Sequence, residues 1–197
     1  MNSLANQLVR GSSRLTELGV GFALVGDLAV SARTEPRFTR DADLAVGVAN
    51  DLEAELVVRH FLRSGYELVS TVEDEATSRL ATARLVDTDV YPSITDLLFA
   101  SSGIEPEIAA AADSLVLAPG VAMPVARIGH LIVMKLLARD DRRRPTDADD
   151  LAALRSRANE RDWREANVGA TLVMERGFAR GRDLAQLLTT LRLEGAF

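Results

Sequence analysis

Hydrophobic residues in the first part of the chain recur at helical spacing and then gather in short continuous runs. The leading leucines stand three, four or seven positions apart: Leu4, Leu8, Leu15 and Leu18. This spacing places them on one face of a helix over residues 3–18. The next apolar runs, Phe22–Val25 and Ala42–Val46, predict two strands, joined through Gly26 and a short helical segment at Leu28–Arg33.

The middle of the chain predicts two further helices and several strands. One helix begins at Asn50 or Asp51, whose side chains can accept hydrogen bonds from the first turn, and ends at Gly65. A second helix is predicted at Glu105–Ala112. Apolar alternation or continuous apolar character predicts strands at Tyr66–Val72, Leu80–Val86, Ser93–Phe99, Leu115–Leu117 and Val121–Pro124.

The chain is helical in pattern from Arg127 onward. Helices are predicted over residues 127–141, 146–159, 163–176 and 182–193. A mixed half followed by a helical half predicts an α/β (α+β) fold, in which helices flank a small mixed β-sheet. We expect a core over residues 1–125 and a helical C-terminal part over residues 126–197, packed together as one compact unit.

Composition narrows the class of protein. With 197 residues, 47% hydrophobic and 26% charged, the chain is typical of one globular unit. A net charge of −6 disfavours a protein that coats nucleic acid. No apolar run approaches the ~20 residues that span a bilayer, and the N-terminus lacks a signal sequence, so we expect a cytoplasmic protein with no membrane partner. The absence of cysteine fits this location and excludes disulfides, thiolate zinc sites and a cysteine nucleophile.

Two carboxylates stand one residue apart at the entrance to the second strand. In an extended segment Asp41 and Asp43 project to the same face, and sharing a hard cation such as Mg²⁺ relieves their repulsion. A strand that ends at Gly26 and feeds a helix also leaves backbone N–H groups for phosphate oxygens. The alternative is a turn with two solvated acids, and Asp87 and Asp89 in LVDTDVYP are interpreted as such a turn.

Three ionisable residues stand in otherwise apolar segments. Asp96 lies in SITDLLF, where a third metal-facing carboxylate or a hydrogen-bonded structural aspartate would each explain a buried charge. Lys135 lies in HLIVMKLLA, and its ammonium either reaches the surface or meets an anion, which we favour. Asp150 follows on the next helix as a functional candidate, whereas Thr146 and Asp147 are interpreted as a helix cap.

The remaining polar residues are weaker candidates for a functional site. His60 and His130 lack the spacing of a zinc site and are interpreted as structural. The G-x-S-x-G, P-loop and dinucleotide-binding motifs are absent. The arginines of ARDDRRRP, residues 138–145, form either a solvated loop between two helices or a patch that faces phosphate.

The order of these features resembles a known family. A strand, Gly26 and a helix are followed by RFTRDAD, by TDLLFA around Asp96, by HLIVMKLLA and by DADDL. This order resembles the AbiEii-like nucleotidyltransferases, minimal members of the DNA polymerase beta-like nucleotidyltransferase superfamily. Many of them are toxins of bacterial toxin–antitoxin pairs, including mycobacterial examples. The resemblance covers residues 22–154, and the matched features in order are more specific than any one alone.

The resemblance implies a function and a set of site residues. The fold would be nucleotidyltransferase-like, and the reaction would transfer NMP from an NTP to a hydroxyl of a tRNA or protein acceptor, with Mg²⁺ or Mn²⁺ as cofactor and a cognate antitoxin as possible partner. Asp41, Asp43 and Asp96 resemble the metal ligands, and Asp96 also the base toward the attacking hydroxyl. Lys135 resembles the lysine that holds the nucleotide phosphates, and Asp150 the acid paired with its helix. The other nucleotide-binding positions implied are Gly26, Asp27, Thr39 and Arg40.

The chain departs from the superfamily at Asp27, where Ser or a second Gly is common. A carboxylate there would repel a triphosphate unless it turns away or joins the metal shell. Two alternatives to the toxin hypothesis therefore stay open. One is a non-catalytic module with this fold that acts through a protein partner, and the other is a small-molecule nucleotidyltransferase of the antibiotic-modifying kind.

Overall fold

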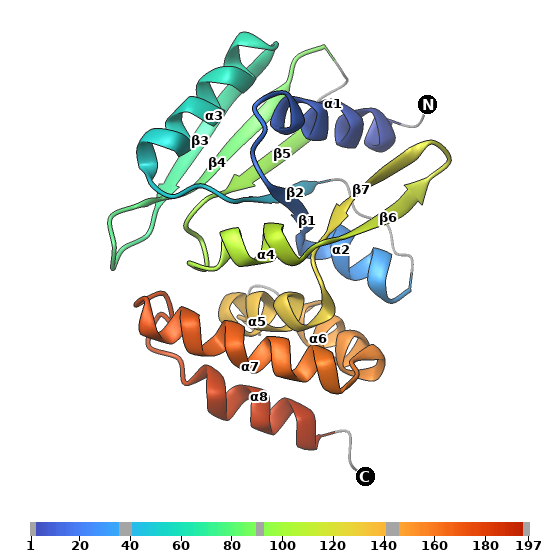
Figure 1. Cartoon of the computed structure of the whole chain (residues 1–197), viewed down its shortest axis with the longest axis vertical. Coiled ribbons are helices and arrows are strands. Elements are labelled where there is room, and N and C mark those ends of the chain that lie inside the picture. The colour runs from blue at the N-terminus through green and yellow to red at the C-terminus, as the bar shows by residue number, and fades with distance from the viewer. Residues whose placement is uncertain (1–2, 36–40, 90–92, 141–145, 195–197) are drawn as a thin grey trace.

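A seven-stranded mixed β-sheet crosses the upper part of the molecule in Figure 1. The structure is a computed structural model that describes residues 3–35, 41–89, 93–140 and 146–194. The strands are β1 (Phe22–Val25), β2 (Ala42–Val46), β3 (Tyr66–Glu73), β4 (Leu80–Asp87), β5 (Ser93–Leu98), β6 (Asp113–Ala118) and β7 (Val121–Val125). Their order is β3-β4-β5-β2-β1-β7-β6, with β2–β5 and β1–β7 parallel and the other neighbours antiparallel. The predicted mixed α/β fold is confirmed.

Some helices pack on the sheet, and the helices that follow the last strand in the chain fill the lower part of Figure 1. The helices are α1 (Ser3–Glu17), α2 (Gly26–Arg33), α3 (Asp51–Arg63), α4 (Glu105–Ala111), α5 (Ile128–Ala138), α6 (Thr146–Arg157), α7 (Glu160–Glu175) and α8 (Leu184–Leu193). The Asn50 side chain accepts a hydrogen bond of 3.1 Å from the backbone N–H of Glu53, so it caps α3 as predicted. Helix α2 begins at Gly26, two residues earlier than predicted.

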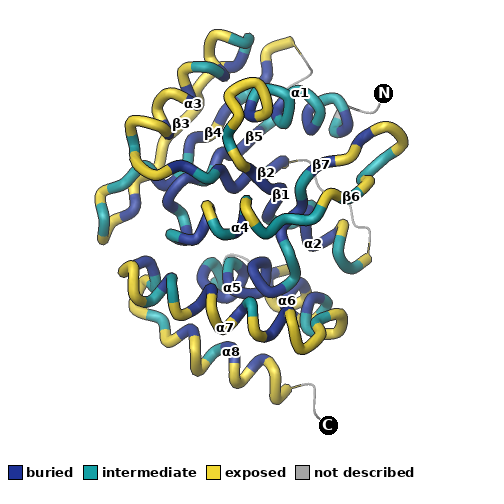
Figure 2. Tube along the Cα trace, in the orientation of Figure 1, coloured by how far each residue is buried: buried dark blue, intermediate teal, exposed yellow. Residues whose placement is uncertain are grey.

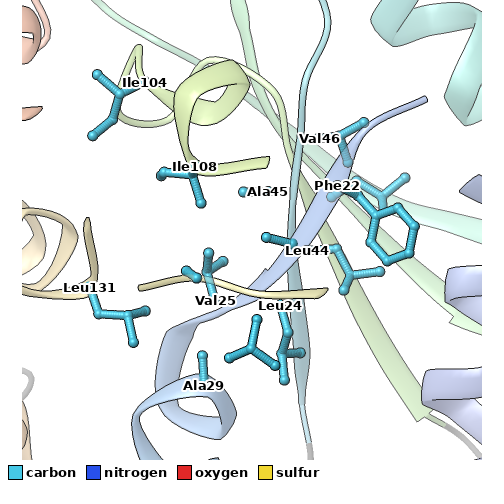
Figure 3. Close-up of a cluster of buried hydrophobic side chains, with 14 of the residues drawn as sticks. Phe22, Leu24, Val25, Ala29, Leu44, Ala45, Val46, Ile104, Ile108 and Leu131 are labelled. Carbon is cyan, nitrogen blue, oxygen red and sulfur yellow. The ribbon is translucent and has the colours of Figure 1, made fainter. Parts of the chain in front are cut away.

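The core runs from the central strands into the helices below them. Strand β1 is buried at every position, as its uninterrupted apolar sequence predicts for a central strand. Figure 3 shows side chains of β1, α2, α4 and α5 in one cluster, among them Val25, Ala29, Ile108 and Leu131. In Figure 2 the buried colour likewise follows the central strands and α5, while α3 and α8 carry exposed positions.

Helix α5 lies at the centre of the helical half, between α2, α6, α7 and α8. A Cβ atom on Gly129 would lie 2.4 Å from the backbone oxygen of Asp162 on α7, so the glycine allows the two helices to approach closely. Because α5 is covered on almost every side, its sequence is apolar around the whole helix. Within the described ranges, no helix combines the length and the apolar character needed to cross a membrane.

Strand β7 ends at Val125 and α5 begins at Ile128, close to the predicted division at residues 125 and 126. The division of the chain into a core and a helical C-terminal part stays a prediction. Contacts of α2 with α5 and α6 join the two predicted parts.

Candidate active site

A cleft of about 440 Å³ lies where the sheet meets α2 and α5. Residues from β1, β2, β4, β5 and the first turn of α2 line its sheet side, and α5 lines the other. Most of the predicted site residues line the cleft: Gly26, Asp27, Asp41, Asp43, Asp96 and Lys135. The structure thus brings together residues that lie more than a hundred positions apart in sequence.

Strand register places the acidic residues side by side. Asp43 on β2 is the Cα partner of Asp96 on the parallel strand β5, and Asp96 is in turn paired with Arg84 on β4. Neighbouring strands are about 4.8 Å apart, so residues at one register position present their side chains to the same face. Asp41 precedes β2 by one residue and is exposed at the mouth of the cleft. The cleft therefore has an acidic wall.

Gly26 leaves the space that the Asp43 side chain occupies. Its backbone has φ +66°, in the region that favours glycine. A Cβ atom at this position would lie 1.9 Å from Oδ2 of Asp43 and 2.8 Å from its Cγ. The Asp43 carboxylate thus occupies the space that any other residue at position 26 would fill.

Arg84 binds Asp96 with two hydrogen bonds and was not predicted from sequence. Its Nε lies 2.9 Å from Oδ1 of Asp96, and an Nη atom lies 2.7 Å from Oδ2. The hydrogen bond to Asp96 and the charges of Asp96, Asp41 and Asp43 raise the pKa of the Arg84 guanidinium, although burial opposes them. Apolar alternation in β4 leaves Arg84 opposite the buried face, but only the strand register shows that it meets Asp96.

Lys135 lies among three carboxylates, not at the surface. Its Nζ is 2.6 Å from Oδ1 of Asp27, 2.8 Å from Oδ1 of Asp147 and 2.7 Å from Oδ2 of Asp150. Burial alone would lower the pKa of Lys135, but the hydrogen bonds that its ammonium donates to Asp147, Asp150 and Asp27 outweigh burial and raise the pKa. The ammonium is therefore charged at neutral pH and is held in one place.

Asp147 was predicted only as part of a helix cap, but it is also a partner of Lys135. Its side chain is fully buried and contacts Lys135, as does Asp150 one turn later on α6. The three-residue spacing puts both carboxylates on the face of α6 that meets α5. The three-residue spacing of Asp147 and Asp150 can be read from the sequence, but the packing of α6 against α5 cannot.

Other residues that the sequence singled out either fall outside the described ranges or do not line the cleft. Thr39 and Arg40 fall outside the described residues, as do positions 141–145 of the arginine-rich segment. Asp87 and Asp89, interpreted as a turn, are at the end of β4, where Arg10 contacts both at 2.5 and 3.0 Å. Neither is among the residues that line the cleft.

Two solved structures are similar over most of the chain. An antigenic nucleotidyltransferase-like protein from Paracoccidioides brasiliensis is 19% identical, with a TM-score of 0.55, over 96% of this chain and 93% of that one. ANT(2″)-Ia in complex with adenylyl-2″-tobramycin is 14% identical, with a TM-score of 0.50, over 96% and 95%. The fold is nucleotidyltransferase-like. No protein-family model and no curated protein matches the sequence, so membership of the AbiEii-like family stays a hypothesis.

In this nucleotidyltransferase-like fold, two acidic groups are candidates for a cation. Asp27, Asp147 and Asp150 each offer an oxygen within 4.8 Å of the others, but the Lys135 ammonium already contacts all three. Asp41, Asp43 and Asp96 do not form so close a group, and a cation held by all of them requires their side chains to converge.

Proposed function

We propose that the protein is a metal-dependent nucleotidyltransferase, which transfers NMP from an NTP to an acceptor hydroxyl and releases pyrophosphate. The observation that carries this proposal is the pairing of Asp43 with Asp96 on β2 and β5, in a cleft where Gly26 leaves room for the Asp43 carboxylate. The nucleotidyltransferase-like fold supports it.

The donor set fits a hard divalent cation. Asp41, Asp43 and Asp96 offer carboxylate oxygens on one side of the cleft, and Mg²⁺ or Mn²⁺ is bound by one or two such groups together with phosphate oxygens. A bound cation would supply charge neutralisation at the phosphates. Gly26 leaves room for the carboxylate of Asp43, and Arg84 holds the carboxylate of Asp96 with two hydrogen bonds before any ligand binds.

The other residues position the substrates. Gly26 and Asp27, in the first turn of α2, line the cleft, and the free backbone N–H groups of a helix's first turn suit phosphate oxygens. Lys135 brings a fixed positive charge to the same place, and Asp147 and Asp150 orient it. Asp96 accepts the proton of the attacking hydroxyl. The oxygen of that hydroxyl forms the new bond to the α-phosphorus, while the bond from the α-phosphorus to pyrophosphate breaks. Positioning and charge neutralisation account for most of the catalysis of phosphoryl transfer.

The test is transfer of label from each of the four NTPs, labelled at the α-phosphate, in the presence of Mg²⁺. Acceptors are bulk tRNA, protein extract and the protein itself. We expect transfer by the wild type and loss of at least about 100-fold in the double variant Asp41→Asn, Asp43→Asn. Asp149→Asn, an exposed acid outside the cleft, serves as control. Equal labelling by the wild type and the double variant would refute the proposal.

The acceptor and the biological role come from the resemblance to AbiEii-like proteins. On that basis we propose a tRNA or protein acceptor and a toxin that a cognate antitoxin neutralises. Induced expression in a bacterial host should arrest growth, and the Asp43→Asn variant should not. Growth arrest by both proteins alike would separate toxicity from nucleotidyl transfer.

A small-molecule acceptor is the second candidate. It is favoured by the similarity to ANT(2″)-Ia, whose structure contains adenylyl-2″-tobramycin. Tobramycin is therefore included among the acceptors, and label on tobramycin but not on tRNA or protein would select this alternative. The non-catalytic module predicts that calorimetry detects no Mg²⁺-dependent binding of any NTP.

A further inference from the structure

The Lys135 ammonium has its hydrogen bonds already taken. A lysine side chain carries three N–H donors and no acceptor. Three carboxylate oxygens lie 2.6 to 2.8 Å from Nζ, one each from Asp27, Asp147 and Asp150. A phosphate oxygen can therefore bind Lys135 only if one of these carboxylates gives up its place.

The three carboxylates differ in how easily they can leave. The side chains of Asp147 and Asp150 are 0% and 4% exposed, on a helix packed against α5. The side chain of Asp27 is 36% exposed and lines the cleft. Moving Asp147 or Asp150 would disturb the packing of α6, whereas Asp27 can turn toward solvent.

Asp27 also occupies the second positive feature of the site. It is in the first turn of α2, directly after Gly26, where a negative charge is stabilised by the helix dipole. Phosphate oxygens would use the same helix end and the same ammonium. The Asp27 carboxylate thus satisfies, within the protein, both groups that favour an anion at this end of the cleft.

We propose that Asp27 is an internal competitor for the phosphate chain of the nucleotide. This inference rests on the proposed function, because it assumes that an NTP binds in this cleft. Binding of a phosphate oxygen to Lys135 breaks the contact between Asp27 and Lys135, and the displaced carboxylate then repels the phosphates. The charge at position 27 therefore lowers the affinity for triphosphates, and an uncharged residue there raises it.

The experiment is calorimetric titration of the full chain with inorganic tripolyphosphate and with each NTP, in the presence of Mg²⁺. Asp27→Asn removes the charge and keeps the size of the side chain, while Asp27→Glu keeps the charge. We expect the dissociation constants of Asp27→Asn for tripolyphosphate and for the bound NTP to fall at least about fivefold. Asp27→Glu, which keeps the charge, should not show this fall.

Asp51→Asn is the matched control. Asp51 is likewise an acid in the first turn of a helix, and it contacts Arg79 at 3.2 Å outside the cleft. This variant should bind as the wild type does, which excludes a general effect of net charge. Melting temperatures of all variants show whether each protein is folded.

The outcomes separate the two proposals. If the wild type binds an NTP and Asp27→Asn binds it equally or more weakly, the competitor role is wrong and the nucleotidyltransferase proposal stands. Tighter binding by Asp27→Glu as well as by Asp27→Asn would also overturn the competitor role, because charge would not be the cause. If neither the wild type nor Asp27→Asn binds any NTP, both proposals fail.

Discussion

The carboxylate of Asp43 owes its position to a neighbour that has no side chain. Gly26 takes φ +66° and leaves the space where Oδ2 of Asp43 lies. A residue in this backbone region costs about 1–2 kcal/mol when it is not glycine. At position 26 the steric conflict with the carboxylate adds to that cost, so the glycine serves both the turn and the site.

Replacing Gly26 with alanine should therefore abolish transfer as well as lower stability. The new methyl group displaces the Asp43 carboxylate, and label transfer from NTP should fall at least about 100-fold. Gly120→Ala is the control, because Gly120 has φ +77° and, its chain neighbours aside, no atom of the described residues lies within 4 Å of the place that its methyl group would take. Gly120→Ala should lose about 1–2 kcal/mol of unfolding free energy in urea denaturation, and Gly26→Ala should lose more, because the clash with Asp43 adds to the backbone cost. Equal transfer by both variants would show that Asp43 does not need this space.

Arg84 is a positioning residue for Asp96. Its two hydrogen bonds hold both carboxylate oxygens, and lysine cannot reproduce this paired geometry. In Arg84→Lys we expect kcat to fall about tenfold or more, while KM for the NTP changes less than about threefold. Steady-state kinetics with the acceptor saturating measures both.

Arg79→Lys is the control for Arg84. Arg79 contacts Asp51 at 3.2 Å, and it does not line the cleft. Its replacement should leave kcat and KM unchanged. A higher kcat in Arg84→Lys would mean that the arginine restrains Asp96, and a change in KM alone would mean that it binds the nucleotide.

At the scale of elements, the sequence predicts what forms but not what pairs. The apolar runs at β1 and β2 predict both strands with their observed bounds, because local burial decides them. The pairing of β2 with β5 joins Asp43 to Asp96 across more than fifty residues, and no local pattern specifies it. Asp41 and Asp43 are close in sequence, so they could be predicted as a site. Arg84 meets Asp96 only through strand pairing, so it could not be predicted.

Two acids in the first turn of α6 can show whether Asp147 acts only as a helix cap or also as the partner of the buried Lys135. Asp147 is buried against Lys135, whereas Asp149, two residues later in the same turn, is exposed. Asp147→Asn removes one charge-assisted hydrogen bond from a buried ammonium and should cost about 1–3 kcal/mol of unfolding free energy. Asp149→Asn should change it by less than about 0.5 kcal/mol.

Urea denaturation of the two variants measures this difference. If Asp147→Asn is as stable as Asp149→Asn, the contact with Lys135 contributes nothing. If Asp147→Asn is more stable than the wild type, repulsion among the three carboxylates outweighs their attraction to Lys135.

At the scale of the whole molecule, the cleft depends on both predicted parts of the chain. Of the residues that line it, Asp27, Asp43 and Asp96 come from the first 125 residues and Lys135 comes from the rest. These residue types and the order of the helices and strands could be predicted from the sequence, because apolar runs and helical spacing are patterns among neighbouring residues. It could not show that Lys135 and Asp27 meet, since that contact depends on how α5 packs against α2.

His130 should make the stability of the whole fold depend on pH. It is 6% exposed on α5, and burial lowers its pKa below the ordinary 6.5, with Glu165, Arg127 and Glu107 as its charged surroundings. The unfolded chain binds a proton near pH 6.5 and the folded chain only at lower pH. The free energy of unfolding therefore falls as the pH drops below about 6.5, by at most about 1.4 kcal/mol per pH unit.

Melting temperatures between pH 7.5 and 5.0 measure this effect, in a range above the titration of ordinary carboxylates. The wild type should melt at lower temperature as the pH falls, and His130→Gln should lose most of that slope. His60→Gln is the control, because His60 is the other histidine and lies against Glu17 on α1, 3.0 Å away, outside the core. A slope that persists in His130→Gln would mean that other titrating groups cause it, and that the burial of His130 does not govern the pH dependence of stability.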